Sequence, residues 1–108
     1  MEKNKFESGK FRFNECIDYS TNGIVSKRVL ENTAGNITLF SFDKGQKLSE
    51  HSAPYNAMLQ VVEGEGEVII DKIPYQLGLG ETIIMLANIP HAVNAIEQFK
   101  MVLTMIKG

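Results

Sequence analysis

Two histidines, His51 and His91, are the residues best suited to chemistry in this sequence, and it contains no others. A neutral imidazole can donate or accept a hydrogen bond, move a proton near neutral pH or bind a metal ion. Each histidine lies in a stretch that opens on a glycine, Gly45 in the first case and Gly80 in the second. This similar layout predicts that the two histidines meet at one pocket.

Three interpretations of the histidine pair remain open at this point. In the first, His51 and His91 are hydrogen-bonding groups in a metal-free or weakly metal-binding pocket. In the second, they form a two-histidine metal site that water, a substrate or another residue completes. Imidazole suits zinc, nickel, iron or copper, and the sequence does not choose among them. In the third, both are incidental core or surface residues.

The elements that must position the histidines have the pattern of strands. Short segments rich in β-branched and aromatic residues alternate with glycine-containing turns, and no helical period holds for a full helix. Strands are expected at a short segment around Phe11 and Phe13, then at Ile24–Leu30, Asn36–Phe42, Ala57–Val62, Thr82–Leu86 and Phe99–Ile106, with a hairpin over Glu67–Leu77. The hairpin turn is expected at Asp71-Lys72, and Pro74 indicates an edge strand. The pattern predicts one all-β domain over residues 1–108, a sandwich or barrel, with residues 1–10 as a frayed lead-in.

Composition excludes several classes of function. Apolar residues make up 44% and charged residues 22% of the chain, and the formal net charge is -2. Because no basic face is visible, we expect no nucleic-acid partner. No apolar run reaches the length of a membrane span, and the charged N-terminus does not have the pattern of a signal peptide. The single Cys16 cannot form an internal disulfide and is expected to be a small core or surface residue, and we expect a cytoplasmic protein.

The first histidine stretch resembles the first motif of the cupin superfamily. That motif has a glycine, two histidines, a glutamate and a closing glycine at set spacings. Gly45, His51 and Gly64 fall on the pattern, whereas Ala53 stands at the second histidine position and Ala57 at the glutamate position.

The second stretch is similar to the second cupin motif. Gly80 and His91 match it, while Leu86, Asn88 and Ala95 replace a proline, a glycine and an asparagine. The resemblance covers about residues 35–106. It implies an antiparallel double-stranded β-helix, also called a jelly-roll barrel, with a cavity between two sheets.

The resemblance also sets expectations about metal binding. In most cupins three histidines and one glutamate hold a divalent metal in the cavity, and only His51 and His91 remain of those four here. Two imidazoles leave a metal underligated, since structural zinc takes four protein ligands and catalytic zinc usually three. We therefore expect a barrel that binds a small molecule in a cavity marked by His51 and His91, with at most a weak divalent metal site. A metal-dependent enzyme of the oxygenase or isomerase type is the alternative, and a structural domain acting through its dimer surface is a third.

Gln60 is the remaining candidate binding residue. It interrupts the apolar run Met58–Val62, and alternation from the family ligand positions turns Leu59 and Val61 inward and Gln60 outward. A slip in the alternation at Pro54 would reverse this, so a pocket role and an interface role for Gln60 both remain open. Outward Met58, Gln60 and Val62 would form an apolar patch that needs cover. Many small cupins pair through such a face, so we expect a homodimer.

Overall fold

The computed structural model describes residues 9–107, which form nine strands and one short 3-10 helix. In chain order these are η1 (Phe13–Glu15), β1 (Ile24–Asn32), β2 (Gly35–Phe42), β3 (Lys47–His51), β4 (Asn56–Gly64), β5 (Gly66–Ile70), β6 (Ile73–Leu77), β7 (Thr82–Met85), β8 (His91–Asn94) and β9 (Phe99–Ile106). Over this range, no helix is long and apolar enough to cross a bilayer.

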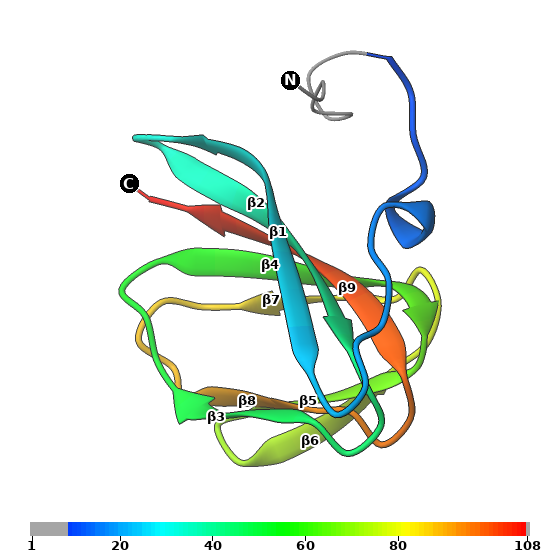
Figure 1. Cartoon of the computed structure of the whole chain (residues 1–108). Coiled ribbons are helices and arrows are strands. Elements are labelled where there is room, and N and C mark those ends of the chain that lie inside the picture. Colours follow the sequence, from blue (N-terminus) through cyan, green and yellow to red (C-terminus); the bar gives the residue numbers. More distant parts are fainter. Residues whose placement is uncertain (1–8, 108) are drawn as a thin grey trace.

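The strands form two facing antiparallel sheets (Figure 1). One has the order β1-β2-β9-β4-β7 and the other the order β3-β8-β5-β6. Strands that are neighbours in a sheet are mostly distant in the chain, and β9 lies between β2 and β4. This crossing of segments between two sheets is the jelly roll, and it confirms the expected all-β barrel.

Most of the expected strands are present. β1, β2, β4, β7 and β9 cover the segments predicted from composition and alternation, and β9 has the predicted bounds. Asp71 and Lys72 join β5 to β6 with φ angles of 50° and 68°, the positive values that a type I′ hairpin turn requires. Pro74 lies in β6, an edge strand, where its missing N–H costs no ladder hydrogen bond.

Three local expectations were wrong. The short strand around Phe11 and Phe13 is instead an irregular segment with the helix η1, in which the two phenylalanine rings pack edge to face at 5.2 Å. From the sequence, His51 is expected where a strand begins, but it ends strand β3, because the chain turns toward the other sheet directly after it. Leu86 lies beyond the end of β7 and is exposed.

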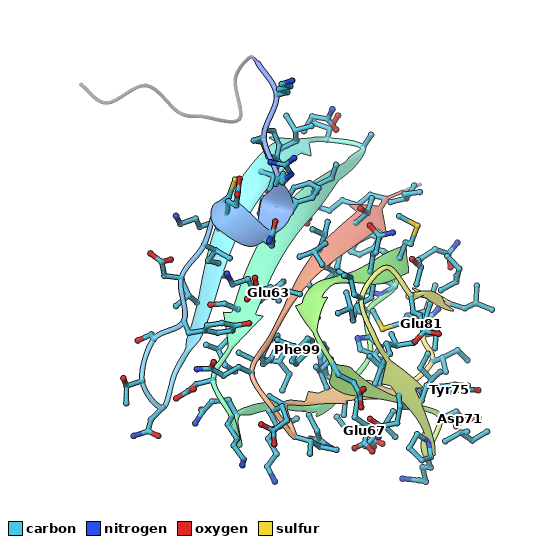
Figure 2. The ribbon with its side chains drawn as sticks, turned by 90° about the vertical axis from the view of Figure 1, so that its right-hand side faces the viewer. Glu63, Glu67, Asp71, Tyr75, Glu81 and Phe99 are labelled. Atoms are coloured by element: carbon cyan, nitrogen blue, oxygen red, sulfur yellow. The ribbon has the colours of Figure 1, made fainter. Side chains whose placement is uncertain are left out.

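The core between the sheets is built on stacked aromatic rings. Phe42 of β2 and Phe99 of β9 stack with ring centroids 4.7 Å apart and planes 9° apart. Figure 2 labels Phe99, which lies inside the barrel. Around the two rings, Leu59 and Val61 of β4 and Val68 of β5 have no exposed surface. The alternation predicted for β4 is therefore confirmed, with Leu59 and Val61 inside.

The outer face of the five-stranded sheet carries a second apolar cluster, which the segment before β1 covers. Cys16 and Ile17 of this segment, both almost fully buried, pack on Val29, Leu39 and Val102 of the sheet. Cys16 is thus a core residue, one of the two placements that the sequence left open. The segment acts as a strap across one part of this face.

Polar contacts around the buried Lys100 hold the strap in place. The Lys100 ammonium donates to the carbonyl oxygen of Asn14 at 2.7 Å, lies 3.2 Å from the Glu63 carboxylate and sits 4.9 Å from the centre of the Tyr19 ring. The Tyr19 hydroxyl donates to the same carboxylate at 2.7 Å. Burial alone would raise the pKa of Glu63, but the hydrogen bonds from Tyr19 and Lys100 and the lysine charge outweigh it and leave that pKa lowered. Glu63 therefore stays charged and fixes the strap to the sheet.

A glycine under the Phe99 ring gives the first testable prediction. A Cβ atom at Gly66 would lie 2.5 Å from one ring carbon of Phe99, while a Cβ at Gly78 would meet nothing closer than 3.5 Å. Because overpacking a well-filled core costs about 1–3 kcal/mol, Gly66→Ala should lower the free energy of unfolding by about that amount. Gly78→Ala is the matched control, expected within about 0.5 kcal/mol of the unchanged protein. Urea unfolding measures both, and equal stabilities of the two variants would contradict the packing argument.

Candidate functional site

His51 and His91 lie side by side, as the sequence predicts. They are paired residues of the neighbouring strands β3 and β8. Their ring centroids are 4.4 Å apart and their planes are inclined by 66°, an edge-to-face contact. Two segments separated by about a third of the chain therefore place their imidazoles in direct contact.

The register of the four-stranded sheet places both histidines on its inner face. Val93 of β8 pairs with Val68 and is buried in the core between the sheets. His91 lies two residues earlier on the same strand, so alternation gives it the same face. Its partner in β5, Ile70, also packs against that core, and His51 shares the face as the partner of His91.

Backbone carbonyls hold one nitrogen of each ring. Nδ1 of His51 lies 2.8 Å from the Ser49 oxygen, and Nδ1 of His91 lies 3.2 Å from the Ile89 oxygen. A carbonyl oxygen only accepts, so these contacts require a proton on each Nδ1. In the neutral form, the lone pair of each ring is then on Nε2. Both imidazoles thus present an acceptor, or a metal ligand, away from their own strand.

The surroundings keep His91 in that neutral form. Burial lowers its pKa, and the neighbouring His51 lowers it further, because a second positive charge beside the first is unfavourable; the carbonyl of Ile89 opposes both effects without overcoming them. The ordinary value for the group is 6.5. At neutral pH, His91 is therefore an uncharged hydrogen-bonding group.

The inner face of the other sheet is apolar at this end of the barrel. Ala57 of β4 pairs with Met85 of β7 on one side and with Met105 of β9 on the other. Ala57 and Met85 are buried in the core, while Leu48 and Leu103 next to that core keep part of their surface exposed. The histidines therefore stand at the rim of an apolar interior.

Comparison with family models decides the classification. A cupin domain model matches residues 38–107, which include both histidines and seven of the nine strands in full. The chain belongs to the cupin family.

Solved structures agree with this classification. The cupin resembles a conserved protein of unknown function from Streptococcus pyogenes, with 35% identity, a TM-score of 0.90 and coverage of 97% of this chain and 93% of the other. It also resembles a cupin 2 conserved barrel domain protein from Leptotrichia buccalis, with 40% identity and a TM-score of 0.87 over 90% of this chain and 47% of the other, so it spans about half the length of that relative. A salicylate 1,2-dioxygenase from Pseudaminobacter salicylatoxidans shares the fold at 18% identity, with a TM-score of 0.72 over 78% of this chain and 26% of that one. A comparison with curated proteins gave no match.

The side chains of this cupin do not fit the four-ligand metal site that the resemblance implies. Ala53 lies in the connection between β3 and β4, and Ala57 lies in β4, so the two missing ligand positions carry only methyl groups. Within residues 9–107, no group of three or more His, Cys, Asp or Glu side chains could hold a metal ion. Glu50, the carboxylate next to His51 in sequence, instead lies 3.7 Å from the Lys72 ammonium.

Gln60 does not join the histidines. It pairs with Thr82 and Val102 and alternates with the buried Leu59 and Val61, which places it on the outer face of the five-stranded sheet. There it is half-buried. The structure thus places Gln60 on the opposite face of the sheet from the core that the histidine pair borders.

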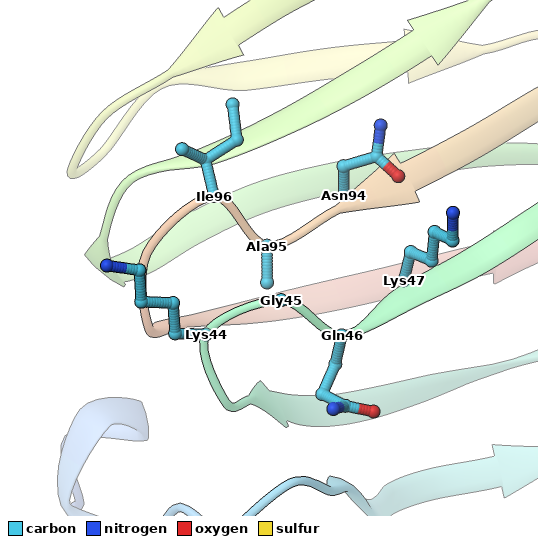
Figure 3. A pocket seen from close by; sticks show the side chains of 7 residues that line it. All are labelled: Lys44, Gly45, Gln46, Lys47, Asn94, Ala95 and Ile96. Atoms are coloured by element: carbon cyan, nitrogen blue, oxygen red, sulfur yellow. The ribbon is translucent and has the colours of Figure 1, made fainter.

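A shallow pocket at the far end of β3 and β8 does not form a second site. It has a volume of about 340 Å³ and is lined by Lys44, Gly45, Gln46, Lys47, Asn94, Ala95 and Ile96. Its longer side chains point in different directions (Figure 3). Lys44 is already paired with Glu97 at 3.3 Å. The pocket therefore has no set of converging polar groups.

The lowered pKa of His91 makes a prediction about pH. In the unfolded chain this histidine takes up a proton near its ordinary pKa of 6.5, while the folded protein takes it up only at lower pH. Its contribution to stability is therefore intact above 6.5 and is lost as the pH falls from there toward the folded-state value. NMR titration should show His91 titrating below 6.5. In His51→Gln its pKa should rise, because the repulsion between rings is removed, and an unchanged value would show that the rings do not interact.

Proposed function

We propose that this cupin binds a small molecule at the inner end of the barrel where His51 and His91 meet. The observation that carries the proposal is the pair of imidazoles, 4.4 Å apart on the inner face, with each Nδ1 engaged by a backbone carbonyl. An apolar wall with a few directed polar groups is the usual composition of a ligand site. A cytoplasmic location is part of the proposal, since the single cysteine is buried and unpaired.

The two histidines would select the polar part of the ligand. Each neutral Nε2 accepts a hydrogen bond, so a ligand with a hydroxyl, phenol or amide N–H can be held by both rings. The wall around Ala57 and Met85 would take the apolar part. The preferred ligand is therefore a small, mainly apolar molecule that donates hydrogen bonds.

Ligand binding should be visible as thermal stabilisation. A panel of small phenols and hydroxy acids, screened by differential scanning fluorimetry, should contain members that raise the melting temperature; a ligand at 100 times its Kd adds about 2.7 kcal/mol. His51→Ala and His91→Ala should remove the shift. Glu50→Ala, next to His51 but paired with Lys72, is the matched control and should keep it. A shift that survives in both histidine variants would place the ligand elsewhere, and no shift across the panel would speak against a binding module.

A metal-dependent enzyme of the oxygenase or isomerase type is the second candidate. It is favoured by the two Nε2 atoms of His51 and His91, which face away from their carbonyl partners and could take a zinc, nickel, iron or copper ion. The fold shared with salicylate 1,2-dioxygenase supports it only at the level of architecture. A bound metal would act as a Lewis acid or activate oxygen, and the remaining ligands would have to be water or substrate. Stoichiometric zinc, nickel or iron in protein purified without an affinity tag, lost in His51→Ala, would favour this candidate.

We further propose that the cupin is a homodimer through the outer face of its five-stranded sheet. A groove of about 290 Å³ on this face is lined by Asn56, Ala57, Met58, Ile84, Leu86, Thr104 and Ile106, none of them charged. Met58, Ile84, Leu86 and Ile106 are 39–64% exposed. Val62, expected in the same patch, instead packs with the cluster under the strap. The strap thus covers one part of the face and leaves an apolar part that a second copy would cover.

A charge in this groove should dissociate the dimer. Ile84→Lys would place an ammonium in the apolar interface, where burying an unpaired charge is costly, whereas Ile73→Lys makes the same change on the other sheet at almost equal exposure, 55% against 54%. Sedimentation equilibrium at micromolar concentration should give about twice the 12.1 kDa chain mass for the unchanged protein and for Ile73→Lys. Ile84→Lys should give a single chain. A 12.1 kDa species for the unchanged protein would exclude the dimer.

A further inference from the structure

A tight turn between β7 and β8 delivers His91 to the inner face. It comprises residues 86–89 and is closed by a hydrogen bond of 3.3 Å from the Ile89 N–H to the Leu86 carbonyl. Asn88 in this turn has a φ of 67°, a left-handed value that asparagine tolerates. His91 begins β8 two residues after the turn ends. The course of the turn therefore sets where the strand that carries His91 starts.

Three successive N–H groups of the turn donate hydrogen bonds. The N–H of Ala87 donates to Oδ1 of Asn56 at 2.9 Å, and that of Asn88 donates to the Ala53 carbonyl at 2.7 Å. The third is the N–H of Ile89, whose acceptor lies within the turn. The connection that contains Ala53 runs beside the turn at the left of Figure 1. Of these three acceptors only the one from Asn56 belongs to a side chain, so a substitution can remove it.

The same turn ends at the carbonyl that fixes the His91 ring. The Ile89 oxygen lies 3.2 Å from Nδ1 of His91 and requires the proton on that nitrogen. The next carbonyl, that of Pro90, accepts from the N–H of Asp71 at 2.8 Å, which ties the chain after the turn to the hairpin between β5 and β6. The orientation of the Ile89 carbonyl therefore depends on a segment that is held before it and after it.

The sheet itself does not require asparagine at position 56. As the first residue of β4, Asn56 pairs through its backbone with Ile106 of β9, a role open to residues other than proline. Asparagine is depleted in strands, and this side chain is exposed and fills no part of the core. The hydrogen bond to Ala87, 31 residues further along the chain, is therefore what the asparagine side chain contributes.

We infer that Asn56 is a positioning residue for His91. Its amide oxygen holds the turn, the turn orients the Ile89 carbonyl, and this carbonyl keeps the imidazole proton on Nδ1. The lone pair on Nε2 is then available to accept a hydrogen bond from a ligand. Without the Asn56 acceptor, the Ala87 N–H would bond to water and the turn would move more freely. The effect on ligand binding rests on the proposed small-molecule site, whereas the effect on the proton does not.

NMR of the imidazole nitrogens tests this inference. Isotope-labelled full-length protein is observed at a pH well above 6.5, where His91 is neutral and its nitrogen shifts distinguish a proton on Nδ1 from a proton on Nε2. The unchanged protein should show His91 with the proton on Nδ1. Asn56→Ala should move part of the His91 population to the form with the proton on Nε2. Asn56→Asp keeps an acceptor oxygen and should restore the form with the proton on Nδ1.

Asn32→Ala is the matched control. Oδ1 of Asn32 accepts from the N–H of Ala34 at 2.7 Å, which is the same kind of bond in the turn between β1 and β2. This variant should leave both imidazoles unchanged. His51 is a control within the same molecule, because its Nδ1 faces the Ser49 carbonyl of its own strand and should keep its proton in Asn56→Ala. Since both substituted positions are exposed, the core is unaltered, and thermal unfolding verifies that the variants fold.

Ligand binding is the functional readout. For a phenol that stabilises the unchanged protein, Asn56→Ala should raise the Kd roughly two- to tenfold, the effect of about one hydrogen bond, and Asn56→Asp should restore it. A proton that stays on Nδ1 of His91 in Asn56→Ala, or that is lost equally in Asn32→Ala, would overturn the positioning role and leave the histidine site standing. A shifted proton in Asn56→Ala, in a protein that no phenol stabilises, would support the positioning role and count against the proposed ligand site.

Discussion

One continuous antiparallel ribbon organises this barrel. The chain from Lys47 to Gln60 runs against the chain from Thr82 to Asn94, first as β3 with β8 and then as β4 with β7. Between the two sheets the pairing continues, because the N–H of Asn88 donates to the carbonyl of Ala53 at 2.7 Å. The register slips by one residue between Leu48 and His51, before the ribbon bends. The register of this ribbon sets every residue pair along it. The same register therefore places His51 beside His91 and Ala57 beside Met85.

The ribbon also explains which strands could be predicted. β2, β4 and β9 are rich in apolar residues because one or both faces are buried, and this pattern is visible in a short window of sequence. β3 has four exposed residues of five, and β8 has four residues in all, so neither has a pattern of its own. These two strands exist because of pairing with distant segments: β8 pairs with β5 on one side and with β3 on the other. The strands that carry the histidines are therefore the ones that local sequence could not reveal.

Near the N-terminus, by contrast, a strand was predicted where none is present, because apolar and polar residues alternate around Phe11 and Phe13. Phe11 and Phe13 alternate with polar residues, but the backbone turns into η1 at Phe13 and does not continue as an extended strand. Phe13 packs against the cluster around Ile17. The alternation reflects an apolar contact on the outside of the sheet and carries no information about backbone pairing.

The meeting of the histidines was predictable from spacing, whereas the character of the site was not. The spacing of the two motifs assigned both His51 and His91 to the same site. The sequence also showed that alanine, at Ala53 and Ala57, replaces the other ligands of the first motif. The neighbours of Ala57 could not, because they depend on β7 and β9 both pairing with β4. The face on which Gln60 lies depends on the same pairing, since a single slip at Pro54 would have exchanged the two faces of β4.

The two outer faces of the barrel are built differently, and this asymmetry favours the five-stranded sheet as the interface. On the four-stranded sheet, Asn94 and Gln76 donate to the two carboxylate oxygens of Glu67 at 2.9 Å each, a polar row that satisfies its own hydrogen bonds. Burying this row against a partner would remove water from its polar groups at a cost in free energy. Because these groups are already hydrogen-bonded to one another, new bonds to the partner would not offset that cost. The five-stranded sheet instead leaves Met58 and Ile84 exposed beside a strap that already covers its neighbours. Burial of apolar surface is favourable without new polar partners, and for this reason the proposed dimer uses this face and leaves the histidine end of the barrel uncovered.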